Sequence, residues 1–370
     1  MAKSFSQLRL EVLRRRLKRA TGPVVLALDA MGTDHHPSEI LHGAYDAVVL
    51  YPNMTVIATG PQDLLESIIE TYGWKHPRLM VENATEVVAM GEHPADSLKK
   101  EQSSIAVACR LVKNGVAHGI VSPGNTGATM AHALRQWKRL KGISRPAIVA
   151  FMPHPTKPTI MMDMGANVDC RAQHLLDFGI MGTAYAKCIF GRRDPKVGTI
   201  SNGEEDSKGN AVVQEAHQLF HDSPLNFVGN VEGRELFRAA VDVAVCDGFV
   251  GNVLLKFGEG IVEFIFGQIR KGIAETNIVS KIGAFTILPV FRSMKKSMDS
   301  VEFGGAPLLG LNGTCIICHG SARHKAITNA LRVASELVST HLNDHIRVLA
   351  EAVNGQKKVD QLRSGRIEND

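Results

Sequence analysis

The amino-acid sequence predicts an α/β protein with a mainly parallel sheet and helices on both of its faces. Three observations lead to this fold class. Short β-branched runs alternate with amphipathic helical segments, which is typical of right-handed βαβ crossovers. Clusters of glycine and polar residues follow several strands, where ligands bind in parallel sheets. Between residues 252 and 300 the alternation of strands and helices stops, and two apolar helical segments follow. We expect these two segments to protrude from the domain, and we call them the helical excursion.

The predicted strands are short runs rich in Val, Ile and Thr. They cover residues 24–29, 54–59, 78–82, 118–122, 147–152, 159–164, 196–201, 225–231 and 242–247. Helical spacing of apolar residues predicts helices at 97–114, 127–141, 172–190, 210–222 and 322–350. Because clusters such as "SPGNTGA" and "SNGEEDSKGN" follow strands, the candidate ligand-binding groups are expected at the carboxyl ends of the sheet.

The chain divides into three segments by composition. Residues 1–22 form a basic N-terminal extension, with seven Lys or Arg residues against one Glu in the first 20. Its amphipathic pattern fits a contact with acidic lipid or RNA, or an organelle presequence, but we expect a frayed, solvated extension and no nucleic-acid partner. Residues 23–350 are predicted to form a single α/β domain that includes the excursion, and residues 351–370 a polar C-terminal tail.

The composition is that of a folded protein inside a cell. Hydrophobic residues make up 44% of the 370 residues and charged residues 21%, so the overall composition does not indicate disorder. No window has the roughly 18 uninterrupted apolar residues that a membrane span needs. No secretory signal is recognised. The six cysteines are scattered, as expected of reduced thiols.

The stretch "GIVSPGNTGATM", residues 119–130, reads as a strand, a glycine-rich turn and a helix. It nearly matches a nucleotide-binding P-loop, but Asn125 stands in place of the lysine. A helix N-terminus attracts anions, so a phosphate smaller than a nucleotide fits the loop. A tight strand–helix turn with a capping residue fits equally well. The predicted phosphate-binding residues are Ser122, Gly124, Asn125, Thr126 and Gly127.

Two further polar residues are candidates for catalysis. Lys208 stands just before a helix, whose positive end disfavours a lysine unless an anion is present. Neutralisation by Glu204, Glu205 and Asp206 is the alternative interpretation. Asn252 follows "CDGFVG", and its amide suits an oxyanion or a phosphate oxygen, or caps a helix. Asp29, His35, Asp163 and Asn167 also follow strands, and each serves equally well as a cap or turn residue.

Several short motifs are rejected. The "CIICH" stretch at 315–319 spells a haem attachment site but lies in an apolar, strand-like run, so we predict buried or half-buried strand cysteines. The adjacent His35 and His36 lack a distal pair of ligands, so no metal site is predicted. No Gly-x-Ser-x-Gly elbow supports a serine hydrolase.

The spaced motifs, taken in order, resemble those of a known family. They are "LDAMGTDHHP", "SPGNTGA", "DMGAN", "SNGEEDSKGN", "NVEGRELF", "VCDGFVGNVLLK" and "GGAPLLGLNG", and they run from about Val24 to Leu337. The chain thereby resembles the phosphate acyltransferase of bacterial phospholipid synthesis.

The chemistry of such a transfer makes modest demands on the protein. A phosphate-type group loses its second proton near pH ~6, so its dianion is a competent nucleophile at neutral pH and needs no catalytic triad.

The resemblance implies transfer of a long fatty acyl group from acyl carrier protein to inorganic phosphate. The product is an acyl phosphate for the acylation of glycerol 3-phosphate by a downstream acyltransferase. The resemblance also implies a three-layer α/β/α Rossmann-like sandwich, a homodimer, no cofactor, and a cytoplasmic enzyme loosely attached to the inner membrane face. By motif match, Lys208 and Asn252 are expected to be essential.

An acidic carrier protein needs a basic docking site. The segment 134–145 supplies Arg135, Lys138 and Arg139, followed by Lys141 and Arg145, and we expect the first three to bind the carrier. A solvated basic helix face is the alternative. In the excursion, the apolar stripe is expected to form the dimer contact, with Phe285, Ile287, Leu288 and Phe291 touching lipid.

Three other functions fit parts of the sequence. One is a phosphotransacetylase-like enzyme that uses short acyl-coenzyme A. Another is a metal-dependent decarboxylating dehydrogenase, suggested by Asp163 and Asp169. The third is a non-enzymatic membrane-surface scaffold whose glycine loops are only tight turns.

Overall fold

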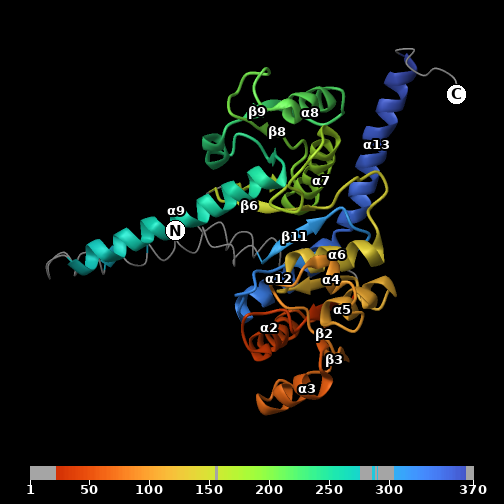
Figure 1. Ribbon diagram of the computed structural model, residues 1–370, viewed down its shortest axis with the longest axis vertical. Helices are drawn as coiled ribbons and strands as arrows, with labels where there is room; N and C mark the ends of the chain where they lie inside the picture. Colours follow the sequence, from red (N-terminus) through yellow and green to blue (C-terminus); the bar gives the residue numbers. More distant parts are fainter. Residues whose placement is uncertain (1–21, 155–156, 276–285, 288–289, 291–303, 364–370) are drawn as a thin grey trace.

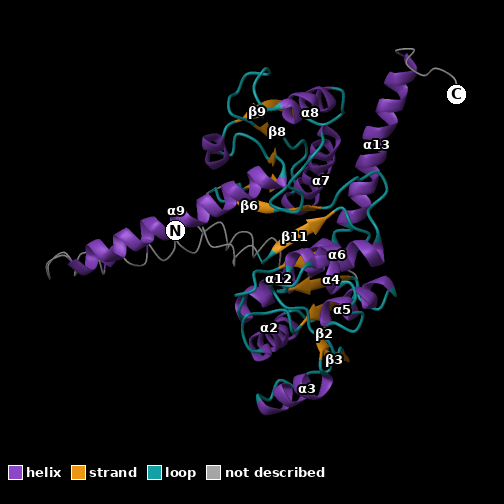
Figure 2. Ribbon diagram, in the orientation of Figure 1, coloured by secondary structure: helices purple, strands orange, loops and turns teal. Residues whose placement is uncertain are grey.

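The computed structural model describes residues 22–154, 157–275, 286–287, 290 and 304–363. Within them, two mostly parallel sheets carry helices on both sides (Figures 1 and 2). The predicted α/β class is therefore confirmed. The sequence led us to expect one sheet, however, and the structure divides the strands between two.

The first sheet has seven strands in the order β3-β2-β1-β4-β12-β11-β5. The strands β1, β2, β3, β4 and β12 are parallel, whereas β11 runs antiparallel to both of its neighbours. Their bounds are β1 Val24–Asp29, β2 Met54–Gly60, β3 Leu79–Asn83, β4 Gly119–Ser122, β5 Ala147–Ile148, β11 Ala306–Leu309 and β12 Thr314–Ile317.

The second sheet has five strands in the order β6-β7-β10-β8-β9, and only β6 is antiparallel. Their bounds are β6 Ala150–Met152, β7 Thr159–Met162, β8 Val197–Ile200, β9 Phe227–Val231 and β10 Val243–Val245. The run 147–152 was predicted as a single strand. It divides because the Val149 N–H donates to Pro307 of the first sheet (2.9 Å), and the next residue pairs with Met161 of the second.

Helices cover both faces of the first sheet. On one side α2 (Pro37–Leu50) packs with α12 (His324–Ser339), and on the other α5 (Ser104–Lys113) packs with α6 (Thr126–Trp137) (Figure 1). The second sheet is covered by α7 (Ala172–Phe190), which also contacts α8 (Ala211–His221) and α13 (Leu342–Arg363). Shorter elements are α3 (Gln62–Thr71), α4 (Pro94–Ser97) and the 3₁₀ helix η1 (Gly233–Arg238).

One hydrophobic cluster runs through both sheets. It joins Val121 of β4 and Val149 to Met162 of β7 and Val245 of β10, all fully buried. The helix α7 contributes Phe178 and Tyr185, and burying each large side chain stabilises the fold by roughly 1.5–3 kcal/mol. This continuity supports a single domain, whose limits near residues 22 and 350 stay a prediction.

Three predicted helices have different bounds in the structure. The helix expected at 127–141 ends at Trp137. The helix expected at 97–114 begins at Ser104, because the Ser103 side chain caps it by accepting the Ala106 N–H. The helix expected at 322–350 is broken at His341, whose φ of 52° is left-handed and incompatible with a continuous helix. The second half, α13, continues to Arg363 through most of the segment predicted as a polar tail.

The predicted excursion begins with α9 (Gly248–Glu275), which extends away from the body of the molecule (Figure 1). Its 28 residues span about 42 Å at 1.5 Å per residue. Only Gly248 and Gly251, at its start, are buried. The second apolar segment lies mostly outside the described residues. In the described part of the chain, no helix is long and apolar enough to span a membrane.

Candidate active site

Three loops meet at the carboxyl edge of the first sheet, because β1, β4 and β12 are neighbours. Thr33, after β1, donates its hydroxyl to the Gly320 carbonyl after β12 (3.1 Å). Cys318 donates its N–H to the Ser122 carbonyl at the end of β4 (2.8 Å). The predicted His35 joins the same contacts, since its Nε2 lies 3.2 Å from the Ser321 carbonyl oxygen. Its ring therefore helps to hold these loops together.

The predicted phosphate loop is built around a buried hydroxyl. Ser122 is fully buried, and its Oγ donates to Asp29 Oδ2 (2.9 Å) while it accepts the Gly124 N–H (3.1 Å). Burial raises the pKa of Asp29, and hydrogen bonds from Ser104 and Ser122 oppose this shift. The polar groups of Ser122 and Gly124 are thus engaged inside the loop and support its shape.

Two glycines let the first two loops touch. A Cβ on Gly32 would lie 2.5 Å from Asp29 Oδ2 and 2.6 Å from the Gly124 Cα. Both distances are shorter than any real contact, so no side chain fits between the turns after β1 and β4. Asp29, Ser122 and Gly124 therefore form one compact unit.

Asn125 is the N-cap of α6. Its Oδ1 accepts the Ala128 N–H (2.9 Å), and its Nδ2 donates to the carbonyls of Met90 and Glu92, both at 2.8 Å. The side chain is thereby saturated. What is left for an anion is Thr126, whose side chain is exposed, together with the N–H groups of Thr126 and Gly127. The hydroxyl and the two N–H groups form no hydrogen bond with a residue in the described ranges. They lie at the N-terminus of α6, which is the positive end of the helix dipole.

Lys208 lies in the loop that follows β8, at the carboxyl edge of the second sheet. Two of the three nearby acids face other groups: Glu204 pairs with Arg234 (3.4 Å), and Asp206 Oδ1 lies 3.3 Å from His217 Nε2. Lys208 is exposed and has no ion pair among the residues that the structure describes. Glu204 and Asp206 therefore do not neutralise Lys208 in this structure. The Lys208 ammonium group is available to bind an anion.

Asn230 of β9 supports this loop, and sequence reasoning missed it. Its Nδ2 donates to the carbonyls of Glu205 (2.8 Å) and Lys208 (3.5 Å), while its Oδ1 accepts the Thr199 hydroxyl (2.8 Å). Asn230 is 6% exposed. The only signal in the sequence was an asparagine inside a strand-like run, next to "VEGRELF".

Asp163 organises the loop after β7. Its carboxylate accepts the N–H groups of Ile148 (2.9 Å), Ala166 (3.2 Å) and Asn167 (2.7 Å), and the Asn167 side-chain amide (2.8 Å). Burial raises the pKa of Asp163, and these hydrogen bonds oppose the shift. The Asn167 amide also reaches the Pro146 carbonyl (2.7 Å), which ties the two sheets together at this point.

Asn252, in the second turn of α9, lies over the loop after β7. A Cβ on Gly165 would lie 3.5 Å from the Asn252 Cβ, and Gly165 has a φ of 120°. The Asn252 side chain is exposed, and its amide bonds no residue in the described segments. The structure thus brings Asn252 together with Asp163 and Asn167.

The site residues fall at two sheet edges. Asp29, His35 and the 122–127 turn share the edge of the first sheet, and Asp163, Asn167 and Asn252 share that of the second. Because β10 lies between β7 and β8, Lys208 emerges at the same edge as Asn252. No hydrogen bond or ion pair between described residues joins the Lys208 loop to the 122–127 turn.

Within the described ranges, no group of three or more His, Cys, Asp or Glu side chains is placed to hold a metal ion. The "CIICH" cysteines are buried, Cys315 within β12 and Cys318 just after it, as predicted. Burial raises the pKa of Cys318 to about 12, so its thiol is inert at neutral pH.

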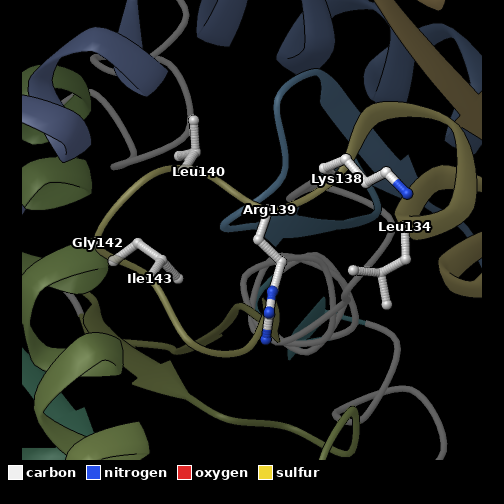
Figure 3. Close-up of a pocket in the computed structure, with 6 residues that line it drawn as sticks. All are labelled: Leu134, Lys138, Arg139, Leu140, Gly142 and Ile143. Carbon is white, nitrogen blue, oxygen red and sulfur yellow. The ribbon is translucent and has the colours of Figure 1, made fainter.

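The predicted docking residues lie around the end of α6. A cavity of about 370 Å³ is lined by Lys138, Arg139, three apolar side chains and Gly142 (Figure 3). Arg139 donates to the Ser144 carbonyl. Arg135 is engaged with the Leu98 carbonyl (2.8 Å) and Glu101 (3.3 Å), so Lys138 and Arg139 are the freer charges.

Comparisons with known proteins place the chain in a family. Residues 24–345 match the model of a family described as "Fatty acid synthesis protein". The phosphate acyltransferase of Syntrophotalea carbinolica is 43% identical over 343 residues, which are 92% of this chain and 98% of that protein. The phosphate acyltransferase of Pelotomaculum thermopropionicum is 46% identical over 331 residues, or 89% and 95% of the two chains.

Two solved structures share the fold. The EutD phosphotransacetylase from Staphylococcus aureus superposes with a TM-score of 0.59 at 16% identity, over 91% of this chain and all of that one. A phosphotransacetylase from Streptococcus pyogenes gives 0.59 at 18% identity, over 88% and 98%. The structural likeness supports the fold, and the sequence identity over nearly the whole chain decides the family: the protein is an acyltransferase of the phosphate acyltransferase family.

Proposed function

We propose that this acyltransferase transfers a long-chain fatty acyl group from acyl carrier protein to inorganic phosphate. The product, an acyl phosphate, then serves a glycerol-3-phosphate acyltransferase in phospholipid synthesis. The observation that carries the proposal is the exposed, unpaired Lys208 at the same sheet edge as the free amide of Asn252. A cation and an amide donor are what a phosphate dianion and a developing oxyanion need.

The reaction needs no covalent enzyme intermediate. A phosphate oxygen attacks the thioester carbonyl carbon, and the carbonyl electrons move onto its oxygen. When this oxyanion collapses, the C–S bond breaks, and the proton carried by the hydrogen phosphate balances the leaving thiolate. In our proposal Lys208 holds the phosphate and Asn252 donates to the oxyanion or orients the phosphate. No cofactor takes part in these steps.

In this proposal, fewer groups of the 122–127 turn after β4 contact phosphate than the sequence suggested. Its free groups are Thr126 and the N–H groups of Thr126 and Gly127, which suit a phosphate oxygen. Ser122, Gly124 and Asn125 are saturated within the protein and act by holding the turn. Asp163 and Asn167 do the same for the turn beneath Asn252.

The test is phosphate-dependent release of free thiol from palmitoyl acyl carrier protein. We expect the wild type to turn over, and Lys208→Ala to lose at least about 100-fold in kcat/KM, as when one oxyanion donor is removed. Lys113→Ala, which removes an exposed lysine at the end of α5, is the matched control. Wild-type behaviour of Lys208→Ala contradicts the mechanism and favours a scaffold with tight turns. Faster turnover of acetyl-coenzyme A than of the palmitoyl donor favours the short-chain alternative.

The oligomeric state and the membrane contact of the protein belong to the same proposal. The exposed apolar side chains of α9 support a homodimer, and the exposed Ile287 and Val290 support peripheral contact with the inner face of the cell membrane from the cytoplasm. Three other residues predicted to touch lipid, Phe285, Leu288 and Phe291, lie outside the described residues.

A further inference from the structure

The cationic surface of the protein extends beyond the predicted docking residues to the start of α7. Its exposed members are Lys138, Arg139, Lys141, Arg145 and Arg171, and none has an ion pair with a described residue. The exposed acid on the same stretch is Asp169. Such an excess of one sign of charge, left unpaired, attracts an anionic partner.

Hydrogen bonds place Arg145 between α7 and the loop after β7. The preceding residue, Ser144, donates its N–H to Asp177 of α7 (2.7 Å), which also accepts the Gln173 amide (2.8 Å). The following residue, Pro146, accepts the Asn167 amide (2.7 Å). Arg145 is therefore held beside the loop that lies under Asn252, and its side chain is exposed.

Arg171 lies at the start of the same helix, as the N-cap of α7. Its N–H donates to His174 Nδ1 (3.2 Å). Burial lowers the pKa of His174, and the charges of Arg145, Arg171 and Arg139 act in the same direction, while the charge of Asp177 opposes them. The positive end of the 19-residue α7 adds to this potential.

We propose that Arg145 and Arg171 together bind an anionic group of the acyl carrier and thereby bring its thioester to Asn252. This inference rests on the proposed function, because it assumes a charged donor. The group is either an acidic side chain of the carrier protein or a phosphate of its prosthetic arm. Guanidinium groups bind carboxylate and phosphate alike, so the chemistry is shared and the donor must be varied to separate the two.

The experiment uses three palmitoyl donors: palmitoyl acyl carrier protein, palmitoyl-coenzyme A and the uncharged palmitoyl-pantetheine. For the double variant Arg145→Glu with Arg171→Glu we expect a loss of about tenfold in kcat/KM with the carrier protein at low salt. The loss shrinks in about 0.5 M salt, where the Debye length falls below about 5 Å. With palmitoyl-pantetheine the variant and the wild type are expected to be equal.

The coenzyme A donor identifies the group that is bound. A loss with this donor too assigns the site to phosphate, and a loss with the carrier protein alone assigns it to acidic side chains. Lys187→Glu is the control, since this exposed lysine lies 16 residues, or about 24 Å, further along α7. The double variant with Gln at both positions, which removes charge without reversing it, is expected to lose less.

Two outcomes overturn the inference. One is an unchanged kcat/KM with the carrier protein, and the other is an equal loss with palmitoyl-pantetheine, which would mean that the arginines maintain the fold or the chemistry. Both leave the proposed function intact as long as the wild type releases thiol in a phosphate-dependent way. Absence of that wild-type activity instead rejects the proposed function itself.

Discussion

At the scale of single residues, the polar groups of the site fall into two kinds. Ser122, Asn125 and Asp163 have their hydrogen bonds satisfied within the protein, and each fixes a turn. Lys208 and Asn252 are exposed, and their end groups bond none of the described residues. A buried polar group without a partner costs roughly 1–3 kcal/mol, so the first kind maintains the fold. The second kind is free to bind substrate.

Asn230 connects a supporting side chain to a substrate-binding one, because its amide donates to the backbone carbonyl of Lys208, whose ammonium group is free. Asn230→Leu keeps the branched shape of the side chain and removes both the donor to Glu205 and Lys208 and the acceptor for Thr199. We expect the loop to lose its fixed position, so that KM for phosphate rises about tenfold while kcat changes by less than about threefold. Initial rates at varied phosphate concentration measure both constants.

The control for this variant is Asn226→Leu, just before the same strand. Its amide bonds Asp194, away from the Lys208 loop (2.7 Å). A double-mutant cycle with Lys208→Ala adds a second check. If Asn230→Leu acts through Lys208, it has little further effect once the lysine is gone. An equal loss in both backgrounds would point to a general loss of stability.

Sequence reasoning found the free residues more readily than the supporting ones. Lys208 was recognisable because a lysine before a helix is electrostatically unfavourable, which is a local property. The inward orientation of the Ser122 hydroxyl could not be recognised from the sequence, because its partner Asp29 lies 93 residues away along the chain. For Asn125, substrate binding and helix capping require the same residue types at the same spacing. Only the fold distinguishes them.

At the scale of elements, the junction between α9 and the loop after β7 sets the position of Asn252. The backbone of α9 passes so close to this loop that a Cβ on Gly251 would lie 1.9 Å from the Asp163 carbonyl oxygen. A Cβ on Gly248 would lie 2.6 Å from the Asn167 carbonyl oxygen. The helix can therefore approach only where it carries glycine.

Gly251→Ala tests this junction. The methyl group must push α9 away from Asp163, which costs about 1–3 kcal/mol and displaces the neighbouring Asn252. We expect a fall of at least about tenfold in kcat together with a lower melting temperature, measured by thiol release and by thermal unfolding. Gly258→Ala on the same helix meets no atom within 4 Å. It should retain activity and stabilise α9 by up to about 1 kcal/mol, and equal behaviour of the two variants contradicts the proposed role of the junction.

The elements themselves were predictable where their pattern is local. The strand at 24–29 and the helix at 172–190 have the predicted bounds, since both are long apolar runs with clear ends. The division of 147–152 between two sheets was not predictable, because it depends on Pro307 and Met161, both distant partners. The break at His341 was missed because nothing in its residue type requires a left-handed φ.

At the scale of the whole molecule, α9 carries apolar side chains that the rest of the described chain does not cover. Phe249, Val253, Phe257, Ile261, Phe264 and Ile265 are 41–66% exposed. Their spacing of three and four residues places them along one side of the helix. A soluble protein rarely exposes such a stripe unless another surface covers it. A second copy of the chain, contributing the same stripe, satisfies this requirement with two-fold symmetry.

The proposed dimer can be tested with Phe257→Glu combined with Phe264→Glu, seven residues apart on that stripe and 66% and 65% exposed. Each substitution brings a carboxylate into an apolar contact, and burying an unpaired charge costs several kcal/mol. We therefore expect sedimentation at micromolar concentration to show a dimer for the wild type and a monomer for the double variant. The matched control is Glu263→Lys, a charged neighbour outside the apolar set, and it should stay dimeric. A wild-type monomer, or a double variant that stays dimeric but no longer binds anionic vesicles, would assign the stripe to the membrane surface instead.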